Sequence, residues 1–415
     1  MKKIICIILI LALGVSGYFI YNKLTNNKIK KLTIEETIID INKIYMYGPH
    51  LNLEGSNLPY EELSLVLYNG DFINIPIIKD DNNSFTTSKY VNEGIFLDNL
   101  ENGTYFLFLE NKETINNKEI NKYYSLNNST EYKETIYYSL SNTNKKITIK
   151  SEEEYPTMIF QVEDNKNKEI YDVVLDPGHG GYDGGASKYG YKETDFTLPL
   201  AKKVKALLEE NNIKVKLTRE TDLSKNEKLP EYGPNGRAVI PGEVHAKYLY
   251  SFHLNSSTSK NVKGLEVYTA QNINYDYAKQ IVENLINNLG LTYSNNRVNK
   301  IHDGVYTRMF TNADVKSSIK EYKEAKKIPF DFSTKSNYYY IIRETGGIVT
   351  GAYVDDRNQN MPGNPYYNSN TGTETYLLEL GYITNKTDLN NIKNNMDKYA
   401  ETIANNIINH INTIN

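Results

Sequence analysis

Four side chains that bind metals or move protons lie in or beside apolar runs in the C-terminal half of the chain: His179, Glu193, His253 and Glu379. His179 follows one apolar run within a glycine-rich turn, and His253 follows a second. Glu193 stands in a loop between them, and Glu379 lies inside a third apolar run. Sites in α/β proteins form at the carboxyl ends of the strands, so we expect these side chains to meet at one edge of a sheet.

Two histidines and one glutamate are a known ligand set for catalytic zinc, which keeps a fourth position for water. The only cysteine, Cys6, lies in the N-terminal apolar segment, which excludes thiol chemistry and Cys-type metal sites from the rest of the chain. A lone histidine is more often structural, but only His179 and His253 directly follow strong strand signals in this half. Glu193 could be a helix-start carboxylate, yet Asp195 is the better N-cap candidate. The pattern predicts a zinc hydrolase that uses His179, Glu193 and His253.

Glu379 lies in a strand signal that is otherwise apolar. A buried carboxylate must be paired, metal-facing or protonated, because unpaired burial is costly. A raised pKa suits a general base that works near neutral pH, so we predict that Glu379 is the catalytic residue. Asn255 and Arg343 are weaker candidates for substrate contact. Three further charged residues are expected to brace the surrounding turns: Asp176, Arg219 and Arg237.

Strand signals alternate with helical periodicity over residues 169–415, which predicts an α/β domain with a mixed, largely parallel sheet flanked by helices. Strands are expected at 248–252, 338–342 and 376–380, and helices at 196–210, at 278–289 and at the C-terminal end. Two insertions, at about 294–336 and 346–373, interrupt the alternation and could border the site.

Residues 30–165 contain short alternating runs separated by Asn-Gly and Asp-rich turns. This pattern predicts an all-β, sandwich-like domain, immunoglobulin-like in its strand spacing. A spacer role is favoured over a wall-binding or partner-binding role, because no exposed aromatic cluster can be identified from the sequence.

The first 29 residues resemble an export signal, with a lysine pair followed by apolar residues from Ile4 to Ile20. The apolar run is near the lower limit of about 17 residues for a membrane-spanning helix, so a cleaved signal peptide and an apolar helical membrane anchor both remain open. Either reading places the rest of the chain outside the cytoplasm. The net charge of −4 and the absence of a Lys/Arg block argue against a nucleic-acid partner.

The ordered motifs resemble the zinc-dependent N-acetylmuramoyl-L-alanine amidase family (amidase type 3) over about residues 169–415. The resemblance rests on residues 176–181, Glu193, 217–219 with Asp222, 251–255 and 378–385. It implies that zinc is held by His179, Glu193 and His253, and that Glu379 is the catalytic base. It implies a sheet flanked by helices and a bacterial cell-wall enzyme.

The implied reaction is hydrolysis of the amide between N-acetylmuramic acid and the L-alanine of the stem peptide. Peptidoglycan is then the partner, and the sequence leaves open whether an activator protein is needed. Some family members carry an inhibitory helix before the last glutamate, and the charged segment 316–327 is a candidate for one.

Two alternatives remain at this point. The first is a non-catalytic wall-binding protein that has the same fold, although all four key side chains are present. The second is a zinc peptidase that cuts within the stem peptide.

Overall fold

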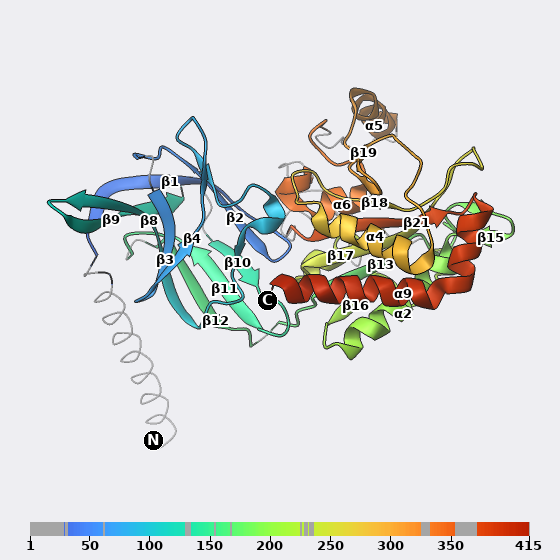
Figure 1. Cartoon of the computed structure of the whole chain (residues 1–415), viewed down its shortest axis with the longest axis horizontal. Helices are drawn as coiled ribbons and strands as arrows, with labels where there is room; N and C mark the ends of the chain where they lie inside the picture. Colours follow the sequence, from blue (N-terminus) through green and yellow to red (C-terminus); the bar gives the residue numbers. More distant parts are fainter. Residues whose placement is uncertain are drawn as a thin grey trace, which may run out of the picture.

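The computed structural model describes residues 29, 32–60, 63–128, 134–152, 155–166, 168–224, 226–227, 231, 236–324, 333–352 and 372–414. They form two lobes, an N-terminal β lobe and a C-terminal α/β lobe (Figure 1). Residues 1–28 of the predicted export segment lie outside these residues. Within the part of the chain that the structure describes, no helix combines the length and apolarity that a membrane span requires.

The N-terminal lobe is all-β, as predicted, but its twelve strands are joined in one hydrogen-bonded sheet rather than in two separate sheets. Side chains from most of these strands share one buried core, around which the sheet curls. The strands are β1 (Ile34–Tyr47), β2 (His50–Ser56), β3 (Leu63–Tyr68), β4 (Phe72–Ile75), β5 (Ile78–Lys79), β6 (Phe85–Thr86), β7 (Ile95–Phe96), β8 (Gly103–Ile115), β9 (Lys118–Asn128), β10 (Glu134–Tyr138), β11 (Lys145–Lys150) and β12 (Ile159–Asp164). A short helix, η1 (Val91–Glu93), precedes β7.

The C-terminal lobe contains a seven-stranded sheet in the order β16-β13-β17-β21-β18-β20-β19. The first four strands are parallel, and β18 runs antiparallel to β21, which confirms the mixed, largely parallel sheet. The strands are β13 (Val173–Pro177), β16 (Val215–Leu217), β17 (Tyr248–Asn255), β18 (Glu266–Tyr268), β19 (Lys300–His302), β20 (Val305–Tyr306) and β21 (Glu374–Tyr382). A small hairpin of β14 (Ser187–Lys188) and β15 (Tyr191–Lys192) lies outside this sheet.

The two faces of this sheet are covered differently. The long helices α2 (Thr194–Glu210), α4 (Asp276–Leu289) and α9 (Lys386–Ile414) pack side by side on one face, where they cover alternate residues of the strands. Helix α6 (Tyr340–Thr345) packs on the other face, where Thr345 and Thr375 pair through their hydroxyl groups. The remaining helices are α3 (Ile240–Glu243), α5 (Asn312–Glu324) and η2 (Gly347–Thr350).

The predicted strand at 338–342 is wrong, because these residues enter helix α6. The run is rich in tyrosine and isoleucine, which favour strands, but packing overrides that preference. Ile341, Ile342 and Thr345 are all buried and follow helical spacing. Asn337 accepts a hydrogen bond from the backbone N–H of Tyr339, just before the helix begins.

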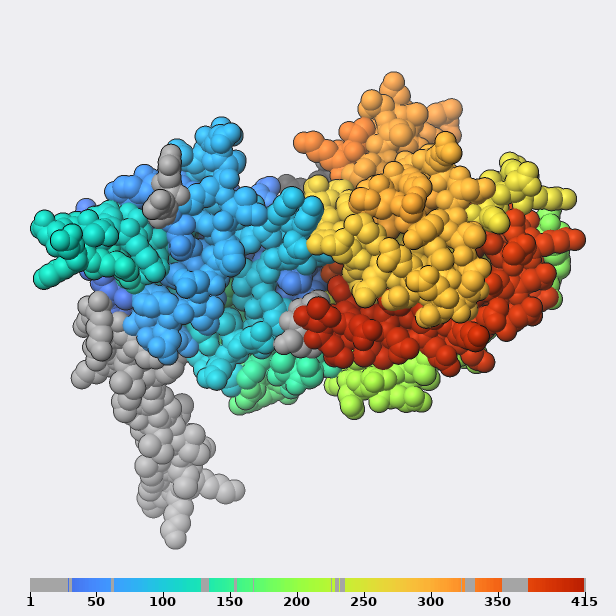
Figure 2. All heavy atoms as spheres, in the orientation of Figure 1, coloured from blue at the N-terminus to red at the C-terminus, as the bar shows by residue number. Residues whose placement is uncertain are grey.

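The two lobes share part of their core. Tyr47 and Leu140 of the N-terminal lobe are fully buried within the hydrophobic cluster of the C-terminal lobe. The connecting residues Ile170 and Asp172 are also buried, so the lobes are joined by packed chain. Figure 2 shows the resulting contact between the β lobe and the α/β lobe.

Candidate active site

His253 and Glu379, two of the predicted site residues, lie in one row across the middle strands of the sheet. His253 of β17 is the register partner of Glu379 on β21, and Glu379 is in turn the partner of Glu266 on β18. Residues paired in register on neighbouring strands point to the same face, so the three side chains are neighbours. They lie on the face that α2, α4 and α9 leave uncovered.

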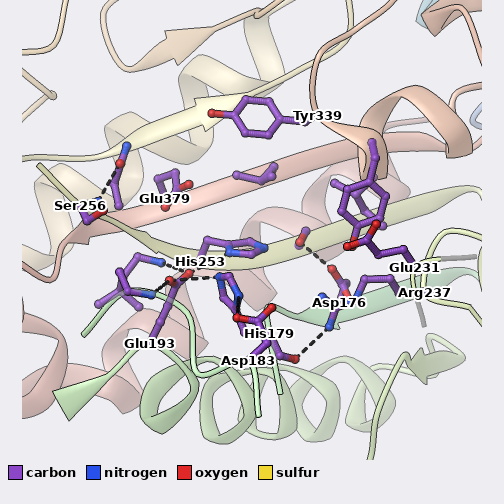
Figure 3. Close-up of a pocket in the computed structure, with 17 residues that line it drawn as sticks. Asp176, His179, Asp183, Glu193, Glu231, Arg237, His253, Ser256, Tyr339 and Glu379 are labelled. Carbon is purple, nitrogen blue, oxygen red and sulfur yellow. Dashed lines mark hydrogen bonds and ion pairs between the residues drawn. The ribbon is translucent and has the colours of Figure 1, made fainter. Parts of the chain in front are cut away.

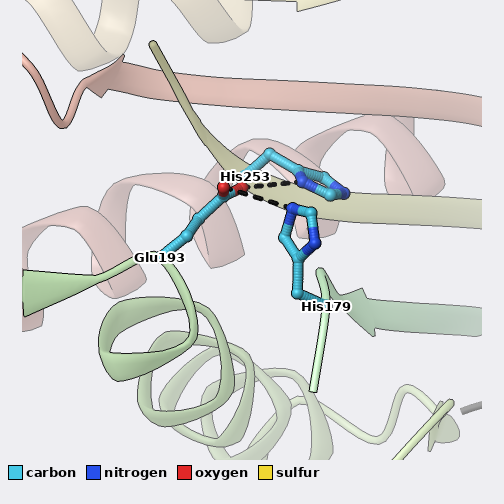
Figure 4. A group of neighbouring side chains, drawn as sticks. All are labelled: His179, Glu193 and His253. Atoms are coloured by element: carbon cyan, nitrogen blue, oxygen red, sulfur yellow. Dashed lines mark hydrogen bonds and ion pairs between the residues drawn. The ribbon is translucent and has the colours of Figure 1, made fainter. Parts of the chain in front are cut away.

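His179, Glu193 and His253 form a compact cluster (Figure 4). Their ligand atoms all lie within 4.8 Å of one another. Glu193 Oε1 is 2.8 Å from His253 Nδ1, and Glu193 Oε2 is 3.2 Å from His179 Nε2. The backbone N–H groups of Leu254 and Ala186 donate to the same carboxylate. The structure therefore brings together the three residues predicted as metal ligands.

Glycines shape the turns around this cluster. A Cβ on Gly178 would lie 2.4 Å from the His253 ring, and one on Gly185 would lie 2.6 Å from both Glu193 and His179. His179 itself has a φ of +62°, in the left-handed region that residues with a Cβ seldom adopt. Strain of this kind is retained where the surrounding structure holds it and is common at functional sites.

Glu193 is the N-cap residue of α2, not a residue of the preceding loop, and Asp195 lies in the first turn of the helix. The side chain of Glu193 makes no cap hydrogen bond and turns toward the histidines instead. Asp195 accepts a hydrogen bond from the backbone N–H of Lys192. The prediction that Asp195 caps the helix is thus wrong by position, although Glu193 is free of capping as expected.

The pKa of Glu193 is set by burial and by the two neighbouring histidines. Burial alone would raise the pKa of Glu193, but hydrogen bonds from His179 and His253 outweigh it and hold the pKa well below the usual range. Burial would likewise lower the pKa of His179, but the carboxylates of Glu193 and Asp183 raise it. Asp183 Oδ1 lies 3.1 Å from His179 Nδ1, on the opposite side of the ring from Glu193. Asp183 was not predicted from the sequence, although it lies only four residues beyond His179.

Asp176, Arg219 and Arg237 brace the turn that carries His179, as predicted. Arg237 pairs with Asp176 at 3.1 Å and donates to the carbonyl of His179 at 3.0 Å. Arg219 donates to the carbonyl of Gly178. Asp176 also accepts hydrogen bonds from Thr218 and Ser251, and with Arg237 these outweigh burial and lower the pKa of Asp176.

A pocket of about 370 Å³ opens over the cluster (Figure 3). Figure 3 shows His179, Glu193 and His253 on one side of it and Tyr339 on the other, and Tyr340 also lines it. The described residues that line the pocket are Asp176, His179, Asp183, Ala186, Glu193, Glu231, Arg237, Ser251, His253, Leu254, Asn255, Ser256, Tyr339, Tyr340, Ile341, Leu377 and Glu379.

Glu379 points into this pocket without a partner of its own. Its Oε2 atom is buried and has no hydrogen-bond partner among the residues that the structure describes. Burial and the neighbouring carboxylates Glu193 and Glu266 raise the pKa of Glu379 well above its usual value. A carboxylate in this state takes up a proton readily, as a general base requires.

Of the two residues predicted to contact the substrate, Asn255 lines the pocket and Arg343 does not. Asn255 lies two residues beyond His253. Arg343 is buried in α6, pairs with Glu344 at 2.7 Å and donates to the carbonyl oxygens of Asn337 and Tyr338. The prediction that Arg343 contacts the substrate rested on a strand that does not form. No described residue of α5 lines the pocket either.

Glu266 was missed by the sequence analysis. Its signal was the same as that of Glu379, a carboxylate within an otherwise apolar strand, Leu265 to Tyr268. Applying the same cost of burial to Glu266 would have found it.

The donor set and the space around it fit a zinc ion. Two imidazole nitrogens and one carboxylate oxygen lie within 4.8 Å of one another, and this is a set that catalytic zinc uses with a fourth position free. Asp183 on the far nitrogen of His179 adds the outer carboxylate that commonly orients a ligating histidine.

Comparisons with known proteins agree with this site. Residues 173–328 match the sequence model of the family described as N-acetylmuramoyl-L-alanine amidase. The chain is 42% identical over 89 residues to "Probable cell wall amidase LytH" of Staphylococcus saprophyticus, a match that spans 21% of this chain and 29% of that protein. It is 37% identical over 103 residues to "Probable N-acetylmuramoyl-L-alanine amidase AmiB" of Haemophilus influenzae. That match spans 24% of this chain and 22% of that protein. The chain thus covers less than a third of either relative.

Among solved structures, the chain is similar to the N-acetylmuramoyl-L-alanine amidase AmiC2 of Nostoc punctiforme, with 24% identity and a TM-score of 0.38. That match covers 59% of this chain and 99% of the other. The segment 173–328, which matches the family model, contains His179, Glu193 and His253. Residues 173–328 of this chain are thus similar in sequence to the N-acetylmuramoyl-L-alanine amidase family.

Proposed function

We propose that the chain is a zinc-dependent peptidoglycan hydrolase that cleaves the amide between N-acetylmuramic acid and the L-alanine of the stem peptide. One observation carries this proposal: the cluster of His179, Glu193 and His253 faces Glu379 across one pocket, within a lobe that carries the amidase family match. The two relatives described above are both named as amidases, which supports the same bond class.

The residues divide the chemistry between them. Zinc held by His179, Glu193 and His253 would polarise the scissile carbonyl and make a water molecule more acidic. Glu379 takes a proton from the attacking water and delivers it to the leaving nitrogen when the C–N bond breaks. The products are a lactyl carboxylate on intact glycan and a peptide with an amino-terminal L-alanine.

Product analysis tests this function directly. The full chain is incubated with purified peptidoglycan, and new amino termini and glycan length are measured before and after chelation and zinc addition. New amino-terminal L-alanine on intact glycan, lost on chelation and restored by zinc, is the expected result. Amino termini of another residue would favour the peptidase, and binding without any product would favour the non-catalytic wall-binding protein.

We also propose that residues 1–29 carry the chain out of the cytoplasm, which a substrate in the cell wall requires. Mass measurement of the mature protein, with membrane fractionation, separates the two forms of this proposal. An intact N-terminus in the membrane fraction indicates an anchor, whereas a shortened chain outside it indicates a cleaved signal peptide. A full-length chain in the cytoplasm would contradict both.

A further inference from the structure

Glu266 is a fully buried carboxylate that accepts four hydrogen bonds. Oε2 accepts from Asn255 Nδ2 at 2.9 Å and from the Tyr268 hydroxyl at 2.8 Å. Oε1 accepts from Ser294 Oγ at 2.6 Å and from the Tyr382 hydroxyl. A carboxylate offers about four acceptor positions, so these donors satisfy it.

No cation pairs with Glu266 within the described ranges of the chain. Burying a carboxylate costs free energy that neutral donors offset only in part, and an apolar side chain would fill a strand position at lower cost. Glu266 is therefore poorly explained by stability alone. Its place beside Glu379, in register on the next strand, points to a role in the site.

The donors to Glu266 come from the ends of the two strands that carry the predicted chemistry. Asn255 lies on β17 two residues beyond His253, and Tyr382 lies on β21 three residues beyond Glu379. The ladder between these strands slips by one residue here, so that Asn255 faces Tyr382. Such bulges re-aim side chains next to active sites. Both re-aimed side chains donate to Glu266.

The bond to Glu266 fixes the orientation of the Asn255 amide. A carboxylate accepts, so the amide must turn its NH₂ group toward Glu266. The amide oxygen accepts from the backbone N–H of Ser256 at 2.8 Å. One N–H of the amide then remains, on a side chain that lines the pocket together with His253 and Glu379.

We propose that Glu266 is a positioning residue that holds the Asn255 amide so that its second N–H donates to an amide carbonyl oxygen of the substrate; this inference rests on the proposed amidase function. Asn255 is then the residue that touches substrate, and Glu266 acts through it. A donor aimed at an oxygen that gains negative charge in the transition state acts mainly on kcat.

Steady-state kinetics of four variants test this on a soluble muropeptide. Asn255→Ala removes the donor, Glu266→Met removes its acceptor, and the double variant removes both. Glu266→Gln keeps an acceptor for Asn255, because its own NH₂ can donate to the hydroxyl groups of Ser294 and Tyr382. Glu374→Gln is the control, since it alters a buried carboxylate on the neighbouring strand β21 that does not line the pocket.

We expect kcat to fall roughly 10²-fold for Asn255→Ala and for Glu266→Met, with smaller changes in KM. The double variant should fall no further, because the two residues act as one unit. Glu266→Gln should recover most of the lost rate, the control should keep the wild-type kcat, and zinc content should be equal in all folded variants.

Three results would overturn the inference while the wild type still releases L-alanine-terminated peptide. They are wild-type kcat in Asn255→Ala, additive losses in the double variant, and a Glu266→Gln variant as slow as Asn255→Ala. The first and third need only conservative variants, so they decide the matter even if Glu266→Met does not fold. No release by the wild type would overturn the proposed function, and the inference with it.

Discussion

At the scale of single residues, the site depends on the buried ion pair of Asp176 and Arg237, which contacts the backbone of His179. Arg237 is 5% exposed and Asp176 is 1% exposed, and together they hold the carbonyl of His179 in place. Breaking such a pair from one side leaves an uncompensated buried charge, which is much more costly than losing the pair as a whole. Asp176 is thus expected to matter for metal retention without touching the metal.

Asp176→Asn should lower the free energy of unfolding by about 3–5 kcal/mol, because the Arg237 charge then stays buried without its counter-charge. Urea unfolding measures this loss, and competition with a chelator measures the expected faster release of zinc. Asp222→Asn is the matched control, since Asp222 is 72% exposed and lies 3.8 Å from Arg219. Its cost should stay below about 1 kcal/mol. Equal stability of the two variants would contradict the bracing role of Asp176.

The residues of the site were predictable where burial made their chemistry conspicuous. His179, His253 and Glu379 stand in or beside apolar runs, and a polar group there needs a reason. Glu266 obeyed the same rule but was missed. The partner of Asn255 and the buried pairing of Arg343 could not be foreseen, because both depend on which strands and helices become neighbours.

At the scale of elements, the pocket is built from strand ends on one side and from the α6 segment on the other. The strands were predicted from alternating and apolar runs, and they place His253 and Glu379 in register. The contribution of Tyr339 and Tyr340 to the pocket lining was not predicted, because this run favours a strand and only the tertiary packing of Ile341 and Ile342 starts a helix at Tyr340.

Helix α5 projects from the C-terminal lobe (Figure 1), and none of its described residues lines the pocket. Its described side chains are mostly exposed, and residues 325–327 of the predicted inhibitory segment 316–327 lie outside the described residues. The segments before and after α5 lie next to each other, since Met309 and Asn337 form an antiparallel β-bridge. The helix can therefore be removed without separating buried elements.

Replacing residues 312–332 with a short Gly/Ser linker should leave turnover within about twofold of the wild type, because loop length affects stability only weakly. Peptidoglycan turnover and zinc content of the shortened chain check this. A large rise in turnover at equal zinc content would instead support the predicted inhibitory role.

At the scale of the whole molecule, the β lobe is packed against the α/β lobe rather than held apart from it. Asn92 of the β lobe donates to Glu374 of β21 at 3.2 Å and also bonds to the backbone of Asn274. Gly48 donates to Gly372 at 2.6 Å. We infer that the β lobe stabilises the lobe that bears the site, which the sequence could not show because Tyr47 and Leu140 look like ordinary residues of a β domain.

The contact between the lobes predicts a pH dependence of stability. Burial raises the pKa of Glu374 from 4.5 to about 7, although hydrogen bonds from Tyr376 and Asn92 lower it in part. The folded state then keeps this proton up to about pH 7, whereas the unfolded chain loses it near 4.5. The stability contribution of the protonated carboxyl is full below pH 4.5, declines as the pH rises to 7 and is absent above it.

Glu374→Gln should therefore match the wild type at pH 4.5 and exceed its stability above pH 7 by on the order of 3 kcal/mol, at about 1.4 kcal/mol for each unit of pKa shift. Chemical unfolding of both proteins from pH 4.5 to pH 8 measures the difference. A constant difference across this range would show that Glu374 does not titrate within the interface.

The measurement that tests the central claim most directly is peptidoglycan turnover by the zinc-loaded Glu379→Gln variant of the full chain, beside the wild type. Glutamine keeps the shape of the side chain but cannot take a proton from water, so the loss of general-base catalysis should be about 10²–10⁴-fold. The account predicts the same zinc content in both proteins, with amino-terminal L-alanine released by the wild type alone. Release by Glu379→Gln at a rate near that of the wild type would contradict the role of Glu379 as the base.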